Sequence, residues 1–212
     1  MDRNAAHIPD VIEAFVRDTV FGFSPRSARI ALFNAVRDLP YATDAASDAA
    51  TLIRARRGNC LAKADVLACG FTQLGYRVRT VRWLYRLPGA PAEVALLPSR
   101  DDVHTALEVF LGQRWRLMDA THDPPLAAIG LTVNDWDGQD GTQPAFVPLG
   151  PVWQVGVDNE AIASAVATIR ARYTDDVSAR ALRYQTAFNR WLDMARMTKQ
   201  SHSRGGVHIR SG

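Results

Sequence analysis

The sequence predicts an α+β fold in which N-terminal helices pack on a mostly antiparallel sheet and further helices close the chain. Three observations lead to this prediction. Apolar residues recur at helical spacing up to about residue 74, strand-like alternation with turn residues follows to about residue 155, and helical spacing then returns. Helices and strands that are segregated along a chain in this way are typical of α+β folds.

Length and composition predict one domain. The chain has 212 residues, of which 47% are hydrophobic, so it can bury a sizeable core without needing a second domain. Residues 1–198 are expected to form this domain. The last stretch, 199–212, has the sequence KQSHSRGGVHIRSG, which shows no periodicity and is expected to be a disordered tail.

The N-terminal part of the chain is expected to be helical. Ser24 before Pro25 is typical of a helix start, and Gly75 of a helix stop. The Arg57-Gly58-Asn59 turn separates the last two helices of this part. The expected helices are Pro9–Phe21, Pro25–Leu39, Asp48–Arg56 and Cys60–Leu74.

The middle of the chain is expected to supply the strands. In Tyr76–Leu87 the apolar alternation changes phase near Thr80 and Val81, which predicts either a bulge or a strand covered on both faces. His104–Leu111 and Arg114–Asp119 are separated by Gly112-Gln113, which predicts a hairpin. A long loop at 120–144 is expected to help shape a site, and the later elements are a strand within Ala145–Val155 and helices at Asp158–Tyr173 and Asp175–Met197.

Charge and hydropathy argue against several classes of partner. The net charge is +3, but the arginines are scattered and the only lysines are Lys63 and Lys199, so no basic patch for nucleic acid is expected. No stretch is apolar for the roughly 18 residues that a membrane span needs, and the first residues lack the apolar core of a signal peptide. We therefore expect a cytoplasmic protein that binds neither nucleic acid nor membrane.

Cys60 is the expected nucleophile. Cysteine attacks as a thiolate, which is favoured at a helix N-terminus and beside an imidazole. Cys60 opens its helix after a Gly-Asn turn and falls on the same helix face as Leu67 and Phe71, the stripe expected to face the sheet. Cys69 lies half a turn round the helix, so it is expected to be structural, and a zinc site that includes both cysteines is not expected.

A histidine and an aspartate complete this constellation. His104 begins one strand of the predicted hairpin and Asp119 ends the other, so the two side chains are expected to be near neighbours. Asp119 would then orient the His104 imidazole and stabilise its cation.

The stretch from Leu52 to Thr121 resembles the core of the transglutaminase-like superfamily. The motifs that carry this resemblance are Gly58-Asn59-Cys60, His104 with Glu108-Val109-Phe110, Gly112 with Trp115, and Asp119-Ala120-Thr121. The resemblance implies a papain-like α+β fold and chemistry through a thioester acyl-enzyme. Many relatives have an acidic residue in place of Asn59 and an aromatic residue directly after the histidine, so the substrate channel is expected to differ. No metal and no cofactor are expected.

The remaining site residues are less defined by the sequence. An oxyanion would be held by the backbone N–H of Cys60 and by one side-chain donor, for which Asn59 and Tyr41 are both candidates. Trp136, in the acidic loop NDWDGQD, is expected to contact substrate.

The expected function is acyl transfer in a biosynthetic step, such as chain release, Dieckmann-type cyclisation or amide formation, on a thioester carried by an acidic carrier protein. One alternative is a cysteine peptidase, amidase or protein transglutaminase that uses the same residues. A second alternative is a binding domain of the same fold without turnover.

Overall fold

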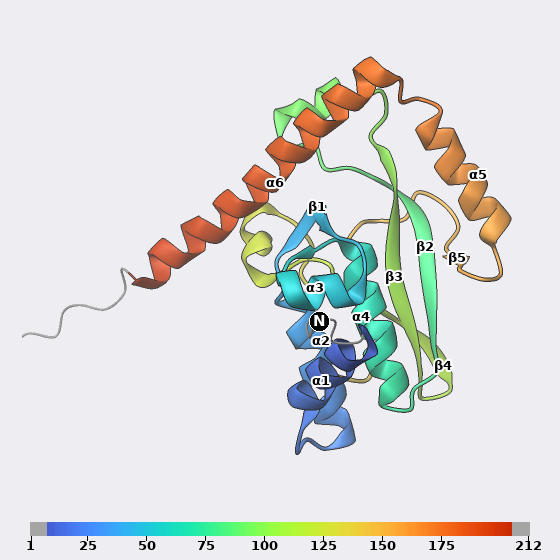
Figure 1. Ribbon diagram of the computed structural model, residues 1–212, viewed down its shortest axis with the longest axis vertical. Coiled ribbons are helices and arrows are strands. Elements are labelled where there is room, and N and C mark those ends of the chain that lie inside the picture. Colours follow the sequence, from blue (N-terminus) through green and yellow to red (C-terminus); the bar gives the residue numbers. More distant parts are fainter. Residues whose placement is uncertain (1–7, 205–212) are drawn as a thin grey trace, which may run out of the picture.

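The computed structural model describes residues 8–204, with side chains described for residues 11–198. Over this range the chain forms a four-stranded sheet with helices on both sides (Figure 1). The expected α+β class is confirmed.

The N-terminal helices lie close to their expected positions. They are α1 (Ile8–Val20), α2 (Pro25–Arg37), α3 (Ala49–Ala55) and α4 (Cys60–Gln73). Ser24 caps α2 by accepting a hydrogen bond from the backbone N–H of Ser27. The sequence did not predict β1 (Tyr41–Ala46), because YATDAA lacks a strand-like alternation and β1 makes only isolated bridges to Gly58.

The sheet has the strand order β4-β3-β2-β5 and is antiparallel throughout. Its strands are β2 (Val78–Arg86), β3 (Asp101–Leu111), β4 (Arg114–Met118) and β5 (Trp153–Gln154). The predicted hairpin of β3 and β4 is confirmed, with Gln113 in the left-handed region at φ 65°. The strand expected within Ala145–Val155 is reduced to β5, since Pro148 and Pro151 cannot donate ladder hydrogen bonds.

The phase change in β2 does not come from a bulge. The register with β3 is unbroken from Val78 opposite Val109 to Arg86 opposite Asp101. Val78 packs against one hydrophobic core, formed with α1, α2 and α4, whereas Val81 belongs to a second core formed with α6. The apolar alternation along β2 therefore changes near Thr80 because the strand contacts the first core before this point and the second core after it.

The neighbouring strands pass from the first core to the second at the residues that pair with this part of β2. In β3, Leu107 belongs to the first core and Ala106 to the second. Met118 of β4 pairs with Leu107 and also lies in the first core. Leu117, the residue before it, packs against the second core, and Asp119, the residue after it, projects from the same face as Leu117.

Two further helices complete the fold. α5 (Asn159–Arg170) lies across the sheet from α4, and α6 (Asp175–Arg204) crosses the upper end of the molecule (Figure 1). α6 supplies Tyr184, Phe188 and Leu192 to the second core. It continues beyond residue 198, so the first part of the expected tail is helical, whereas residues 205–212 lie outside the described residues.

The short segments between these elements include two 3-10 helices, η1 (Ala92–Leu96) and η2 (Pro124–Ile129). The second lies in the long loop that follows Asp119. Among residues 8–204, no helix has the length and apolar character needed to cross a membrane.

Candidate active site

Cys60 is the first residue of α4. It directly follows a turn whose backbone conformation is restricted by hydrogen bonds and by close packing. The backbone N–H of Asn59 donates to the carbonyl of Ala46 at 3.0 Å, and the side-chain oxygen of Asn59 accepts from the N–H of Ala62 at 3.0 Å. A Cβ at Gly58 would come within 2.4 Å of Leu52, so only glycine fits there. The thiol is thereby held at a helix N-terminus, where partial positive charge favours an anion.

The Cys60 side chain lies in a different environment from Leu67 and Phe71, the residues of α4 that were expected to face the sheet together with it. Leu67 and Phe71 lie in the first core, whereas the partly buried Cys60 packs against the second. α4 therefore contacts both cores, with the nucleophile candidate at the end that meets the second.

His104 and Asp119 form a buried pair. The Nε2 atom of His104 lies 2.9 Å from Oδ2 of Asp119, and both side chains are almost fully shielded from solvent. The sheet explains this contact. Met118 pairs with Leu107, so the next residue, Asp119, projects from the same face of the sheet as Ala106 and His104.

Both carboxylate oxygens of Asp119 accept hydrogen bonds. Its Oδ1 accepts from the hydroxyl of Thr121 at 2.6 Å and from the Thr121 N–H at 3.3 Å, while Oδ2 also accepts from the N–H of Ala145 at 2.7 Å. Burial alone would raise the pKa of this carboxyl, but the imidazole of His104 and these donors outweigh it and lower the pKa. Asp119 is thus a fixed negative charge beside the imidazole.

Aromatic side chains enclose the imidazole of His104. The centroid distances from its ring are 4.7 Å to Trp83, 5.2 Å to Phe146 and 5.9 Å to Tyr85. The Trp83 indole donates to the carbonyl of Phe146 at 2.8 Å, which fixes the loop that carries Phe146 against β2.

The charge state of His104 reflects its two neighbours. Burial lowers the pKa of the imidazole, but the charges of Asp119 and Cys60 and hydrogen bonding to both raise it to about 10. Nδ1 of His104 makes no hydrogen bond of ordinary geometry with any residue that the structure describes. Since Nε2 is bound to Asp119, Nδ1 is the atom left to exchange a proton with Cys60.

Tyr41 lies close to the thiol. Burial, followed by the charge of Cys60, raises the pKa of the Tyr41 hydroxyl well above its ordinary value, so this group keeps its proton. The two candidate oxyanion donors therefore differ. Tyr41 presents a buried hydroxyl near Cys60, whereas the side chain of Asn59 is already engaged through its oxygen in capping α4.

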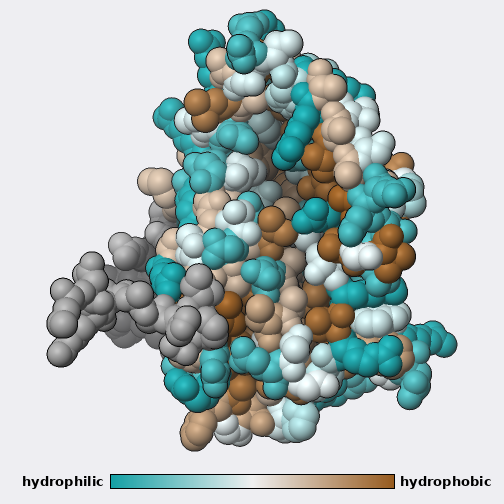
Figure 2. Space-filling view, turned by 45° about the vertical axis from the view of Figure 1, so that its right-hand side comes forward, coloured by the Kyte–Doolittle hydropathy of each residue, from teal (hydrophilic) through white to brown (hydrophobic). Residues whose placement is uncertain are grey.

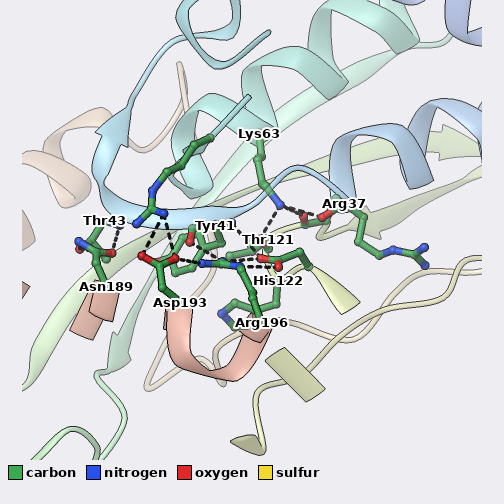
Figure 3. A network of polar contacts seen from close by, with 12 residues as sticks. Arg37, Tyr41, Thr43, Lys63, Thr121, His122, Asn189, Asp193 and Arg196 are labelled. Carbon is green, nitrogen blue, oxygen red and sulfur yellow. Dashed lines mark hydrogen bonds and ion pairs between the residues drawn. The ribbon is translucent and has the colours of Figure 1, made fainter. Parts of the chain in front are cut away.

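A buried lysine holds the backbone around the site. Nζ of Lys63 donates to the carbonyl oxygens of Arg37 at 3.0 Å, Ala120 at 3.1 Å and Thr121 at 2.8 Å (Figure 3). Lys63 is one turn beyond Cys60 on α4, so it ties the helix of the thiol to the loop that follows Asp119. Burial lowers the pKa of Lys63 to about 7.

Arg196 of α6 holds the segment of Tyr41 in place. Its guanidinium donates to both carboxylate oxygens of Asp123, at 2.9 and 2.7 Å, and to the carbonyl of Tyr41 at 2.8 Å. Asp123 in turn accepts from the N–H of Tyr41 at 2.9 Å. Figure 3 shows Arg196 beneath the β1 segment, next to Asp193, which accepts a further hydrogen bond from it.

These supporting residues were missed in the sequence. The signal for Lys63 was present, because it is one of two lysines in the chain and stands three positions after Cys60. No local signal could have found the role of Arg196, since Asp123 and Tyr41, the two partners that it holds together, lie 73 and 155 positions away.

A second histidine is buried beside the site. Nδ1 of His122 lies 2.8 Å from the carbonyl of Thr132, and its ring meets those of Tyr41 and Phe146 edge-on. Burial lowers the pKa of His122 to about 4, so it is neutral at ordinary pH.

The expected substrate contact of Trp136 is wrong. Its side chain is only 6% exposed and packs on Phe33 and Phe71, at centroid distances of 5.5 and 5.8 Å, in the first core. Phe71 is three helical turns from Cys60, about 16 Å along α4. Trp136 fastens the long loop to the helices and does not line the site.

Parts of the chain are similar to known proteins. Residues 23–120 match the core model of the transglutaminase-like superfamily. The chain is similar to a structure of a proposed cysteine protease from Cytophaga hutchinsonii, at 17% identity over 74% of this chain and 51% of that chain, with a TM-score of 0.41. It is also similar to a TGase structure, at 16% identity over 55% of this chain and 32% of that chain, with a TM-score of 0.40.

The chain thus spans about half the length of the first of these proteins and about a third of the second. No curated protein matches the sequence. The segment that matches the family model contains Cys60, His104 and Asp119 and ends one residue after the last of them. By this match, residues 23–120 are similar to the core of the transglutaminase-like superfamily.

Proposed function

We propose that this protein is an acyl-transfer enzyme in which Cys60 is the nucleophile, His104 its base and Asp119 the residue that orients His104. The observation that carries the proposal is the buried 2.9 Å contact between Nε2 of His104 and Asp119, which leaves Nδ1 for the thiol at the N-terminus of α4. A cysteine with an adjacent base that is itself oriented by a third group is the arrangement that nucleophilic catalysis needs.

The reaction follows from these positions. The Cys60 thiol gives its proton to Nδ1 of His104, and Sγ attacks an acyl carbonyl carbon. The bond to the leaving group then breaks as Nδ1–H of His104 protonates that group, and the acyl chain remains on Sγ as a thioester. A second nucleophile loses its proton to Nδ1 of His104 and attacks this thioester. The bond from the acyl carbon to Sγ breaks, and the Cys60 thiolate takes the proton back from His104.

Two donors suit the oxyanion that forms during each attack. The backbone N–H of Cys60 lies in the first turn of α4, where N–H groups have no partner within the helix. The buried hydroxyl of Tyr41, which keeps its proton, is the second donor that we propose. Asn59 would then serve as the cap of α4 that aims the Cys60 N–H.

The acyl donor in this proposal is a thioester on an acidic carrier protein, and the step is chain release, cyclisation or amide formation. The outer face of α6 supports this choice. Together with η1 it borders a groove of about 720 Å³ that contains apolar side chains and the guanidinium groups of Arg183 and Arg190. Basic groups beside apolar surface favour an acidic helical partner.

Alkylation tests the nucleophile. Iodoacetamide at pH 6 to 7, followed by peptide mass mapping, should label Cys60 in preference to Cys69, which is a control within the same chain because burial and Asp65 raise its pKa. Replacing His104 by Gln should remove the preference. Equal labelling of both cysteines in the native protein would contradict an activated thiol and favour a binding domain without turnover.

Intact mass spectrometry tests the donor. The protein should retain an acyl adduct after incubation with an acyl carrier-protein thioester, and the R183E/R190E double variant should lose this adduct while still accepting the same acyl group from a small thioester. Adducts or cleavage with peptides alone would indicate a peptidase instead. Loss of reaction with both thioesters would contradict docking at α6.

A further inference from the structure

A second cavity lies beside the candidate site, with a volume of about 530 Å³, within the usual range for small-ligand sites. It is bordered by the upper end of the β2–β3 hairpin, the end of α5 and the start of α6. Figure 2 shows a hollow in the upper part of the molecule, with paler and brown residues inside and hydrophilic residues on the rims. The lining includes Leu87, Leu97 and Ala181, together with Asp102, Tyr173 and Tyr184.

Asp102 is a carboxylate without a counter-ion. Its oxygens accept from the N–H of Val103 at 2.7 Å and from the hydroxyl of Tyr85 at a long 3.4 Å, and no basic side chain among residues 11–198 lies within 4.0 Å of it. Its neighbour Asp101, by contrast, pairs with Arg86 and Arg172. Asp102 is open to the cavity, yet the surrounding atoms desolvate it enough to raise its pKa.

Tyr184 offers a second unused polar group. The side chain is 4% exposed, and its hydroxyl has no hydrogen-bond partner among the described residues. The charge of Asp102 raises the pKa of this hydroxyl, after burial, so the two groups lie near each other at the cavity. Tyrosine rings and a carboxylate are the surroundings that an organic cation prefers. Arg170 also lines the cavity, but it makes no ion pair with Asp102.

The cavity lies near the proposed catalytic residues. Asp102 stands two positions before His104 on the same face of β3, and the charge of His104 partly offsets the rise that burial causes in the pKa of Asp102. The charges of both Asp102 and Cys60 raise the pKa values of Tyr41 and Tyr85, after burial. A ligand bound at Asp102 would therefore lie close to His104 on β3.

We propose that this cavity binds a primary ammonium group of the substrate, with Asp102 as its counter-ion and the hydroxyl of Tyr184 as a further acceptor. The apolar lining would hold the short alkyl chain that carries the ammonium. This proposal rests on the proposed function, because it names a chemical feature of the substrate that reacts at Cys60.

Binding tests the proposal independently of turnover. The full-length Cys60→Ala protein, labelled with 15N, would be titrated with n-pentylamine at pH 7 and, in parallel, with n-pentanol, which has the same chain without the charge. Saturable shifts in β3 and α6 with the amine, and binding at least about tenfold weaker with the alcohol, are expected. Equal binding of the two probes, or no binding of the amine, would overturn the proposal.

Substitutions test whether n-pentylamine binds in this cavity and at Asp102. Asp102→Asn should weaken the binding of n-pentylamine by at least about tenfold, whereas Glu93→Gln, which removes an acidic group that lines the α6 groove instead, should leave it unchanged. If the Asp102 variant does not fold, Ala181→Trp keeps the carboxylate and fills the cavity, and it should block binding equally. Unchanged binding in either folded variant would contradict the assignment.

Experiments on the wild-type protein can show whether the ammonium group belongs to the acyl donor or to the acceptor. A 2-aminoethyl methanethiosulfonate that labels Cys60 faster than its neutral ethyl analogue, with the difference lost in Asp102→Asn, would place the cation on the acyl donor. Binding of n-pentylamine without such a difference would place it on the acceptor. If Cys60 is not labelled preferentially by any reagent but the amine still binds, the function is wrong and the binding site stands.

Discussion

Nζ of Lys63 donates a 2.8 Å hydrogen bond to the carbonyl of Thr121, whose hydroxyl in turn donates at 2.6 Å to the carboxylate of Asp119. The buried amine of Lys63, on the helix of the thiol, is therefore connected through one residue to the carboxylate that holds His104. This connection allows the support of the site to be tested apart from its reacting atoms.

Replacing Lys63 by Met should destabilise the protein by about 2–4 kcal/mol, because three buried carbonyl oxygens would lose their donor. Urea denaturation would measure the free energy of unfolding. Gln73→Met provides a control on an exposed position of the same helix and should change it by less than about 0.5 kcal/mol. A Lys63 variant as stable as wild type would show that these hydrogen bonds contribute little.

The stability provided by His104 should depend on pH. Its pKa is about 10 in the folded protein against 6.5 for an ordinary histidine, so the folded state binds the proton more tightly. The contribution is fully present below pH 6.5 and is lost as pH rises through about 10, with a slope of at most about 1.4 kcal/mol per pH unit. The difference in unfolding free energy between wild type and His104→Gln, measured by urea denaturation from pH 6 to 10.5, should shrink accordingly. A difference that is constant or grows with pH would mean that the imidazole is not paired with Asp119 as described.

The hydroxyl of Thr121 should matter for reactivity. Thr121→Val removes the hydrogen bond to Oδ1 of Asp119 and should slow alkylation of Cys60 about tenfold, because the carboxylate could then turn away from His104. Thr121→Ser keeps the hydroxyl and should retain nearly the full rate. If both variants react alike, the hydroxyl does not position Asp119.

Arg196 should be important for stability. Arg196→Met leaves Asp123 buried without its main partner and should cost about 3–5 kcal/mol in thermal or urea unfolding. Arg180→Met serves as the comparison, since its ion pair with Asp176 is exposed and should be worth less than about 0.5 kcal/mol. Similar losses in the two variants would contradict a special role for the buried pair.

The residues proposed to react could be found from the sequence because each stands at the end of an element with a clear local signal. A Gly-Asn turn precedes Cys60, and the two-residue turn at Gly112 fixes which residues of β3 and β4 are neighbours. Turn length determines register in a hairpin, so His104 and Asp119 could be placed together before any tertiary contact was known.

The supporting residues could not be found in this way, because their roles depend on packing between distant segments. Trp136 was assigned to the site from its acidic loop, but burial against Phe33 and Phe71 decides its role. The change of phase in β2 allowed a bulge or coverage of both faces, and only the unbroken register and the two separate cores, one contacted by Val78 and the other by Val81, decide between them.

The hydrogen bond from Arg196 to the carbonyl of Tyr41 spans 155 positions of the chain. During synthesis on the ribosome, the segments with Cys60, His104 and Asp119 would emerge well before α6, and the second core would lack Phe188 and Leu192 until that helix arrived. A nascent chain would thus carry its thiol for a time without a finished pocket around it, so reactivity would appear only after α6 has been synthesised and has packed.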